Sequence, residues 1–131
     1  MRKLSSEQKH HEELVNGFYN QLKQVFDSSE QSIYLYLDDN HKVCNKRFAN
    51  LLGYASPEEW ASVENMLEAN VDKSSRQIVA AAYDNAMNKL VGSEIDVRVK
   101  TNAGNIVDVS VIMVPVAYQG HLFAMHFISE K

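Results

Sequence analysis

Residues 45–54 read Asn-Lys-Arg-Phe-Ala-Asn-Leu-Leu-Gly-Tyr, and residues 56–59 read Ser-Pro-Glu-Glu. The first stretch predicts a short helix with apolar side chains facing inward. It stops at Gly53, because glycine is common just past the end of a helix. Ser56 predicts the start of another helix, since its hydroxyl can accept a hydrogen bond from the free N–H three residues on and Pro57 suits the first turn. The middle of the chain is therefore predicted to be helical.

The residues before this stretch predict one long helix and two strands. Apolar residues recur at three- and four-residue spacing over residues 5–27, which is typical of an amphipathic helix. Residues 33–37 and 42–44 are rich in apolar, aromatic and β-branched side chains, as strands are, and the polar residues 38–41 between them favour a turn.

After residue 59, the spacing of apolar residues changes from a helical to a strand-like pattern along the chain. We expect a helix from Asp72 to about Leu90, followed by a half-buried strand over 95–100, where apolar and charged residues alternate. A glycine-containing hairpin loop leads into a long strand over 106–118, and a tight turn leads into a last strand over 122–128. The predicted fold class is α+β, with the order helix, two strands, helical middle and three-stranded meander.

The stretch 45–59 resembles the signature that follows the second strand of PAS domains. In that signature an asparagine opens a short helix that ends in Leu-Gly-Tyr before a Ser-Pro-Glu-Glu helix start. The turn over 38–43 is similar to the family's acidic turn, with His41 where glycine is commoner. Residues 128–130, Ile-Ser-Glu, are similar to the end of the family's exit motif, with Phe127 where the family has aspartate.

This resemblance covers about residues 28–130 and implies a PAS-like five-stranded antiparallel sheet with helices on one face. We expect the N-terminal amphipathic helix on the other face. The predicted division is a cap or dimerisation helix over 1–27 and a PAS-like domain over 28–131.

The resemblance also implies a function, because PAS domains signal by altering contacts with partners and hold a haem, a flavin, another small molecule or nothing. We therefore expect a sensory or signalling module, not an enzyme, acting through small-ligand binding, protein–protein interaction or both. The alternative is a small α+β cone-fold enzyme of the isomerase or dehydratase kind, with Asp108 and His126 acting beside Tyr83 or Tyr36. We expect Asp108 and His126 on the sheet face opposite the apolar core, which argues against catalysis.

The sequence disfavours the familiar cofactors of this family and predicts none. Haem iron needs an axial ligand, usually histidine, and none of the five histidines lies in the helix over 72–90. The cysteine motif that a flavin adduct needs is missing from the helical middle, and Cys44 is interpreted as a small buried hydrophobe. His10 and His11 are neighbours that point apart on a helix, so no metal site is expected.

If the chain binds an unknown small molecule, we expect the pocket between the long helix and the inner sheet face. The candidate pocket residues are Tyr36, Tyr83, Met87, Val97, Val109, Val111 and Met113. A closed, well-packed core is the alternative for residues of this type. Asn45 and Gly53 are interpreted as structural residues of the motif, with Asn45 bonding the backbone at the strand–helix junction.

The last two strands are apolar on both faces, so something must cover the outer face. We place Ile112, Val114 and Val116 on that face, and on the last strand Leu122, Ala124 and Ile128 together with His126. The N-terminal helix offers a matching stripe through Leu14, Phe18, Leu22 and Phe26. We predict that this helix packs across the outer face, within its own chain or swapped to a partner, and that the remaining surface makes a homodimer contact.

The composition limits which cellular compartment and which classes of partner are expected. The chain has 131 residues, which predicts a single folded unit, and a net charge of −4, which argues against binding nucleic acid or anionic membranes. No apolar run approaches the roughly 20 residues needed to span a bilayer. A single cysteine fits a reducing compartment, so the cytoplasm is expected. The expected partners are a second copy and an effector protein such as a signalling kinase or regulator.

Overall fold

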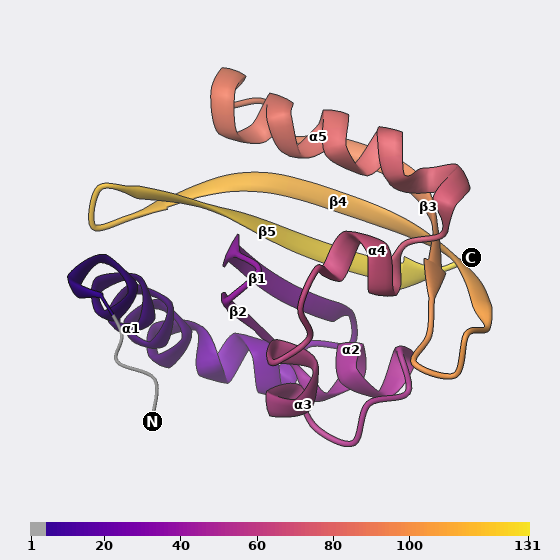
Figure 1. The fold of residues 1–131 in the computed structure, drawn as a ribbon, viewed down its shortest axis with the longest axis horizontal. Helices are drawn as coiled ribbons and strands as arrows, with labels where there is room; N and C mark the ends of the chain where they lie inside the picture. The colour runs from indigo at the N-terminus through magenta and orange to yellow at the C-terminus, as the bar shows by residue number, and fades with distance from the viewer. Residues whose placement is uncertain (1–4) are drawn as a thin grey trace.

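A computed structural model describes residues 5–131 and contains one five-stranded sheet with helices on both sides (Figure 1). In chain order the elements are α1 (Ser6–Ser28), β1 (Ser32–Asp38), β2 (His41–Cys44), α2 (Lys46–Leu51), α3 (Pro57–Ala61), α4 (Met66–Asn70), the 3-10 turn η1 (Lys73–Ser75), α5 (Arg76–Lys89), β3 (Ser93–Lys100), β4 (Ile106–Tyr118) and β5 (His121–Glu130). The predicted α+β fold is confirmed.

The sheet is antiparallel throughout, with the strand order β2-β1-β5-β4-β3. The last strand, β5, therefore lies in the centre, between β1 and β4. In this register His126 of β5 pairs with Tyr34 of β1 on one side and with Met113 of β4 on the other. Residues paired in this way project to the same face of a sheet, so the register decides which side chains of β5 face which helices.

Serine hydroxyls cap two of the helix starts, and the cap at Ser56 was predicted. The Ser5 hydroxyl accepts a hydrogen bond from the backbone N–H of Gln8 at 3.1 Å, and the Gln8 side chain accepts one from the Ser5 N–H at 3.1 Å. The Ser56 hydroxyl likewise accepts from the Glu59 N–H at 3.1 Å. Gly53, just past α2, has φ +80°, a left-handed conformation that glycine adopts without strain.

Two cores lie on opposite faces of the sheet. The inner core packs α2, α3 and α4 against the sheet, and Trp60, Phe48 and Leu52 are fully buried in it. The outer core packs α1 against the other face through Leu14 and Phe26, beside strand residues such as Leu35 and Phe123. Figure 1 shows α1 and α5 on opposite sides of β4 and β5. The predicted position of the N-terminal helix is therefore confirmed.

The predicted helix from Asp72 to Leu90 is interrupted near its start. Asp72 caps the short turn η1 by accepting from the Ser74 N–H at 3.2 Å, and α5 proper begins at Arg76. The cause is tertiary, because the buried Ser75 hydroxyl accepts the Arg98 N–H of β3 at 3.0 Å and holds the turn against the sheet. None of the described helices is both long enough and apolar enough to cross a membrane.

The division of the chain into residues 1–27 and 28–131 stays a prediction, and residues 1–4 of the first segment lie outside the described residues. The described part of α1 shares a buried core with the sheet, as shown by Leu14, Val15 and Phe26.

Candidate functional site

A groove of about 170 Å³ opens between α4, α5 and the inner face of the sheet. β1, α4, α5, β4 and β5 supply its lining, which consists of Tyr34, Tyr36, Met66, Leu67, Val79, Ala80, Tyr83, Met113 and His126. None of these side chains is a lysine, an arginine or a carboxylate. The groove is therefore apolar, with a few tyrosine and histidine polar atoms, as small-ligand sites usually are.

Beneath the groove, the inner core is closely packed. A cavity of only about 20 Å³ remains there, between Val97, Val111 and the α4 side chains, and it shares Tyr34, Met113 and His126 with the groove. A volume of that size holds about one water molecule. Between the inner sheet face and α5, the space for a larger molecule is therefore at the open end of the groove, beside Tyr36 and Tyr83.

The predicted pocket residues divide between three places. Tyr36, Tyr83 and Met113 line the open groove. Val97 and Val111 line the small interior cavity, again with Met113. Val109 is fully buried in the inner core, and Met87 packs beside Ala82 and Ala86 of α5; neither reaches the groove or the cavity.

His126 lies on the inner face, so the prediction that placed it on the outer face was wrong. Its ring stacks on Tyr34 with centroids 3.7 Å apart, and it lines both the groove and the interior cavity. The strand neighbours Leu122, Ala124 and Ile128 were misplaced with it, because they share its parity on β5; the outer positions are Phe123, Met125 and Phe127. Because apolar residues occupy both faces of β5, the alternation of apolar and polar residues along the strand could not predict which side chains face the inner core.

Burial sets the protonation state of His126. Its Nδ1 lies 3.1 Å from the carbonyl oxygen of Ala124, which can only accept, so Nδ1 carries the ring proton. Loss of hydration lowers the pKa of His126 to about 3, despite the opposing effect of its backbone hydrogen bonds. The imidazole is therefore neutral at pH 7.

Two tyrosines supply the other polar atoms of the groove. The Tyr36 hydroxyl donates to Oδ1 of Asp39 at 3.1 Å, and Tyr83 packs edge-on against Tyr36 with ring centroids 5.6 Å apart. Burial raises the pKa of both hydroxyls, and the nearby carboxylates of Asp38 and Asp39 raise the pKa of Tyr83 further. Both hydroxyls therefore stay protonated. The Tyr36 proton is already donated to Asp39, whereas the Tyr83 hydroxyl can donate to a bound molecule.

The catalytic pairing considered from the sequence is not formed. Asp108 is exposed on the outer face, where its Oδ1 lies 3.2 Å from Nε of Arg98, whereas His126 is buried on the inner face. Cys44 is buried as well, and burial raises its pKa to about 12, so its thiol is not a nucleophile at neutral pH.

Asn45 joins three elements through its side-chain amide. Its Oδ1 accepts the N–H groups of Ile33 at 3.1 Å and Phe48 at 3.0 Å, which links β1 to the start of α2. Its Nδ2 donates to the carbonyl oxygens of Phe26 at 3.3 Å and Gln31 at 2.9 Å, at the end of α1 and the loop after it. This is a structural role at the strand–helix junction, away from the groove.

Lys42 is a buried cation that sequence reasoning missed. Its Nζ donates to the carbonyl oxygens of Asp39, Ala61 and Val63, the last two at 3.2 and 2.6 Å, and lies 5.3 Å from the Trp60 ring centroid. Loss of hydration lowers its pKa. The carbonyls satisfy the ammonium and tie the turn after β1 to the loop after α3.

The outer face is covered only in part. Phe18 of α1 stacks on Tyr118 with ring centroids 4.6 Å apart, and Val114 and Val116 pack in the same cluster with Leu22. Ile112, the third predicted interface residue of β4, lies beyond α1 and is 40% exposed.

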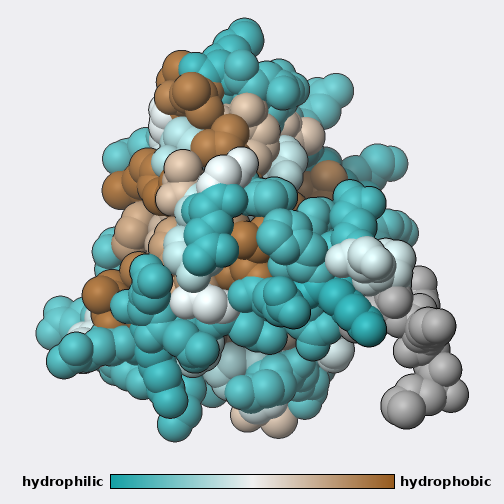
Figure 2. Space-filling view, turned by 90° about the vertical axis from the view of Figure 1, so that its left-hand side faces the viewer, coloured by the Kyte–Doolittle hydropathy of each residue, from teal (hydrophilic) through white to brown (hydrophobic). Residues whose placement is uncertain are grey.

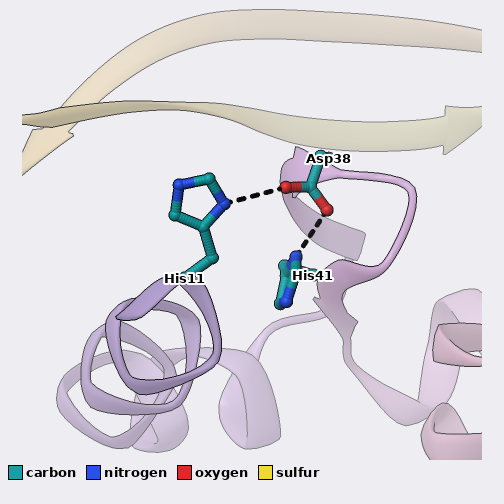
Figure 3. Close-up of side chains that lie close together, drawn as sticks. All are labelled: His11, Asp38 and His41. Atoms are coloured by element: carbon teal, nitrogen blue, oxygen red, sulfur yellow. Dashed lines mark hydrogen bonds and ion pairs between the residues drawn. The ribbon is translucent and has the colours of Figure 1, made fainter. Parts of the chain in front are cut away.

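The structure also brings together residues that the sequence analysis kept apart. His11 of α1, Asp38 at the end of β1 and His41 at the start of β2 offer ligand atoms that all lie within 4.8 Å of one another (Figure 3). The sequence pointed only to His10 and His11, which are neighbours on the helix. No local spacing signals the cluster, because α1 meets the turn only through tertiary packing.

No protein-family model and no curated protein sequence matches the chain. Solved structures do match. A PAS domain from a two-component sensor histidine kinase has a TM-score of 0.67 at 14% identity, covering 88% of this chain and 98% of that one. The PAS domain of a Colwellia psychrerythraea protein has a TM-score of 0.68 at 15% identity, covering 87% and 97%.

A third neighbour extends over more of the chain. The PAS domain of an HTR-like protein from Haloarcula marismortui has a TM-score of 0.62 at 17% identity and covers 94% of this chain and 99% of that one. The chain therefore has the PAS fold, which confirms the predicted resemblance at the level of the fold.

Proposed function

We propose that this chain is a PAS-type sensory or signalling module that binds a small, uncharged, mostly apolar molecule in the groove between α5 and the sheet. The observation that carries the proposal is the groove itself, which is open and apolar at the end where Tyr36 and Tyr83 meet. The sensor histidine kinase whose PAS domain is similar in fold supports a signalling role.

The lining favours an uncharged ligand. An anion would find no lysine or arginine among the lining residues, and His126 is neutral because burial lowers its pKa to about 3. A cation would face two tyrosine hydroxyls and no lining carboxylate. The volume of about 170 Å³ is also below the roughly 300–1,000 Å³ typical of sites for drug-sized ligands, so it suits a compact molecule.

Strand β5 offers a route from the groove to the outer face. Ala124 and His126 contact the inner side, where His126 lines the groove, while Phe123 and Met125 pack against α1 on the other side. Because alternate residues of one strand project to opposite faces, a ligand that shifts β5 would change the packing of α1. In this proposal the signal passes to a partner by contact.

The proposed partner surface is the uncovered part of the outer face, used in a homodimer. Ile112 is exposed there, and its cross-strand partner Phe127 is only partly buried. Gly92, after α5, lies at the edge of this face, because a Cβ there would be 3.2 Å from Val114. Figure 2, which views the end of the molecule where the β4–β5 turn lies, shows apolar side chains reaching the surface among polar ones. A self-complementary patch of this kind suits a two-fold contact.

The first experiment is a native mass spectrum of the gently purified protein, together with two matched variants of α5. Ala80→Trp fills the mouth of the groove, whereas Ala81→Trp places the same side chain at the next exposed position, outside the lining. We expect a discrete extra mass in the wild type and in Ala81→Trp that disappears on denaturation, and its loss in Ala80→Trp.

Two results would count against ligand binding. Bare wild-type subunits would favour a filled core and a protein-interaction role. An extra mass retained equally by both tryptophan variants would place the bound molecule outside the groove.

A further inference from the structure

We propose that His11, Asp38 and His41 form a binding site for a divalent transition metal such as Zn²⁺, and that the metal fastens helix α1 to the β1–β2 turn. The Asp38 carboxylate lies between the two imidazoles (Figure 3). Its Oδ2 is 3.2 Å from Nδ1 of His11, and its Oδ1 is 2.6 Å from Nδ1 of His41.

The donor set fits this class of metal. Imidazole nitrogen and carboxylate oxygen are ligands of Zn²⁺ and of neighbouring transition metals, whereas Ca²⁺ and Mg²⁺ prefer oxygen alone. Metal–ligand distances of about 2.0–2.2 Å in a tetrahedron place donor atoms about 3.3–3.6 Å apart. The three donor atoms already lie within 4.8 Å of one another, so small side-chain rotations bring them to that spacing.

The backbone holds two of the three ligands in place. Asp38 and His41 are paired across the β1–β2 turn, and the Asn40 N–H donates to Oδ1 of Asp38 at 3.0 Å, which orients the carboxylate. Partners of this kind around a metal ligand fix its geometry. His11 comes from the second turn of α1, so the site closes only when α1 is packed on the sheet.

The three ligand side chains are only partly buried, so a metal ion and water can reach them. The side chain of His41 is 10% exposed, that of His11 22% and that of Asp38 41%. The two imidazoles are thus shielded, while the carboxylate side faces solvent. Three protein ligands leave a fourth tetrahedral position for water.

The surroundings are unusually rich in imidazole. Of the chain's five histidines, four gather here from α1 and from the β1–β2 and β4–β5 turns. The His121 ring centroid lies 5.9 Å from that of His11 and 5.1 Å from that of His10. Histidine is the commonest metal ligand in proteins, and segments distant in sequence bring these rings together. We assign His11, Asp38 and His41 as the ligands.

The test is isothermal titration of the full, tag-free chain with Zn²⁺, comparing the wild type with His11→Gln, Asp38→Asn and His41→Gln. The control is Glu12→Gln, which removes a carboxylate charge from the exposed position next to His11. We expect one Zn²⁺ per chain in the wild type and the control. Each ligand variant should bind at least about tenfold more weakly, the minimum seen even for residues that only support a ligand.

A second measurement separates binding at this site from general adhesion of metal to histidines. Zn²⁺ should raise the unfolding temperature of the wild type and of Glu12→Gln, because it binds only where α1 is docked, and should not raise that of the ligand variants. His11→Gln decides the test if the more buried His41→Gln fails to fold. Unchanged Zn²⁺ affinity in His11→Gln, or no Zn²⁺ binding by the wild type, overturns the proposal.

Discussion

At the scale of single residues, buried polar side chains hold the inner side of the fold together. Trp60 donates from Nε1 to Oδ1 of Asn70 at 3.1 Å, and Asn70 donates to the Tyr54 hydroxyl at 2.9 Å. Lys42 donates to three backbone carbonyls. Such groups stabilise a fold only when their hydrogen bonds are complete. Every buried side-chain nitrogen and oxygen among the described residues has a partner.

The first prediction concerns His126 and acid. Because burial lowers its folded pKa from 6.5 to about 3, the unfolded chain binds a proton there before the folded chain does. Its contribution to stability is complete above about pH 6.5 and is lost as the pH falls toward the folded pKa. We expect the wild type to lose up to about 1.4 kcal/mol per pH unit more than His126→Gln in this range.

Urea unfolding at successive pH values measures this difference, since the acidic residues common to both proteins cancel. His10→Gln, which removes an exposed imidazole, is the control and should retain the wild-type slope. Equal slopes for the wild type and His126→Gln would show that His126 is not held neutral by burial.

The second prediction concerns Asn45. Asn45→Ala removes four hydrogen bonds at once and leaves the N–H groups of Ile33 and Phe48 without their acceptor. We expect a loss of about 2–4 kcal/mol in the free energy of unfolding, since each unsatisfied buried group costs about 1–3 kcal/mol. Asn50→Ala, at an exposed position of α2, should change it by less than about 0.5 kcal/mol. Denaturant unfolding of both variants checks this; similar losses would contradict the role of Asn45.

At the scale of elements, α1 covers the outer face of the sheet and β5 contributes side chains to both cores. Helix α1 presents Leu14, Val15 and Phe26 to the outer face and leaves Val25 exposed, so its apolar face is narrow and well defined. β5 is apolar on both sides because it lies between two cores. The spacing of α1 predicts its packing face, whereas the alternation of β5 cannot predict which residues face which core.

The third prediction tests the packing of α1. Leu14 is 2% exposed in the outer core, so Leu14→Ala should cost about 2–5 kcal/mol through lost burial and the cavity left behind. Val25→Ala on the same helix, at a position 54% exposed, should change the free energy of unfolding by less than about 0.5 kcal/mol. Thermal or urea unfolding distinguishes them, and a harmless Leu14→Ala would mean that α1 does not depend on this contact.

At the scale of the whole molecule, a single sheet separates two different environments. The inner side ends in a groove beside Tyr83, and the outer side is closed by α1 except around Ile112. The proposed ligand and dimer contacts therefore lie on opposite faces and share only the sheet. Each can be tested by a substitution whose side chain contacts only one of the two faces.

The fourth prediction concerns assembly. Ile112→Glu places a charge in the proposed dimer contact, so it should shift the protein to monomers in sedimentation velocity while the chain stays folded. Ile78→Glu makes the same change at a similarly exposed position of α5, 44% against 40%, and should leave the dimer intact. A wild-type protein that sediments as a monomer, or an Ile112→Glu variant that stays dimeric, would remove the dimer from the proposed function.

Local chemistry was sufficient to predict the order of the elements, and the resemblance of residues 45–59 to the PAS signature implied the architecture. The caps at Asn45 and Ser56, the turn at Gly53 and the helical period of α1 each depend on neighbours within a few residues, so the sequence alone determines them. Only the tertiary structure decided that His126 faces the groove and that His11 meets Asp38 and His41. The first depends on the register of a strand buried on both faces, and the second on the docking of a helix against a distant turn. Neither leaves a periodic signal along the chain, because each arises from contacts between segments far apart in the sequence.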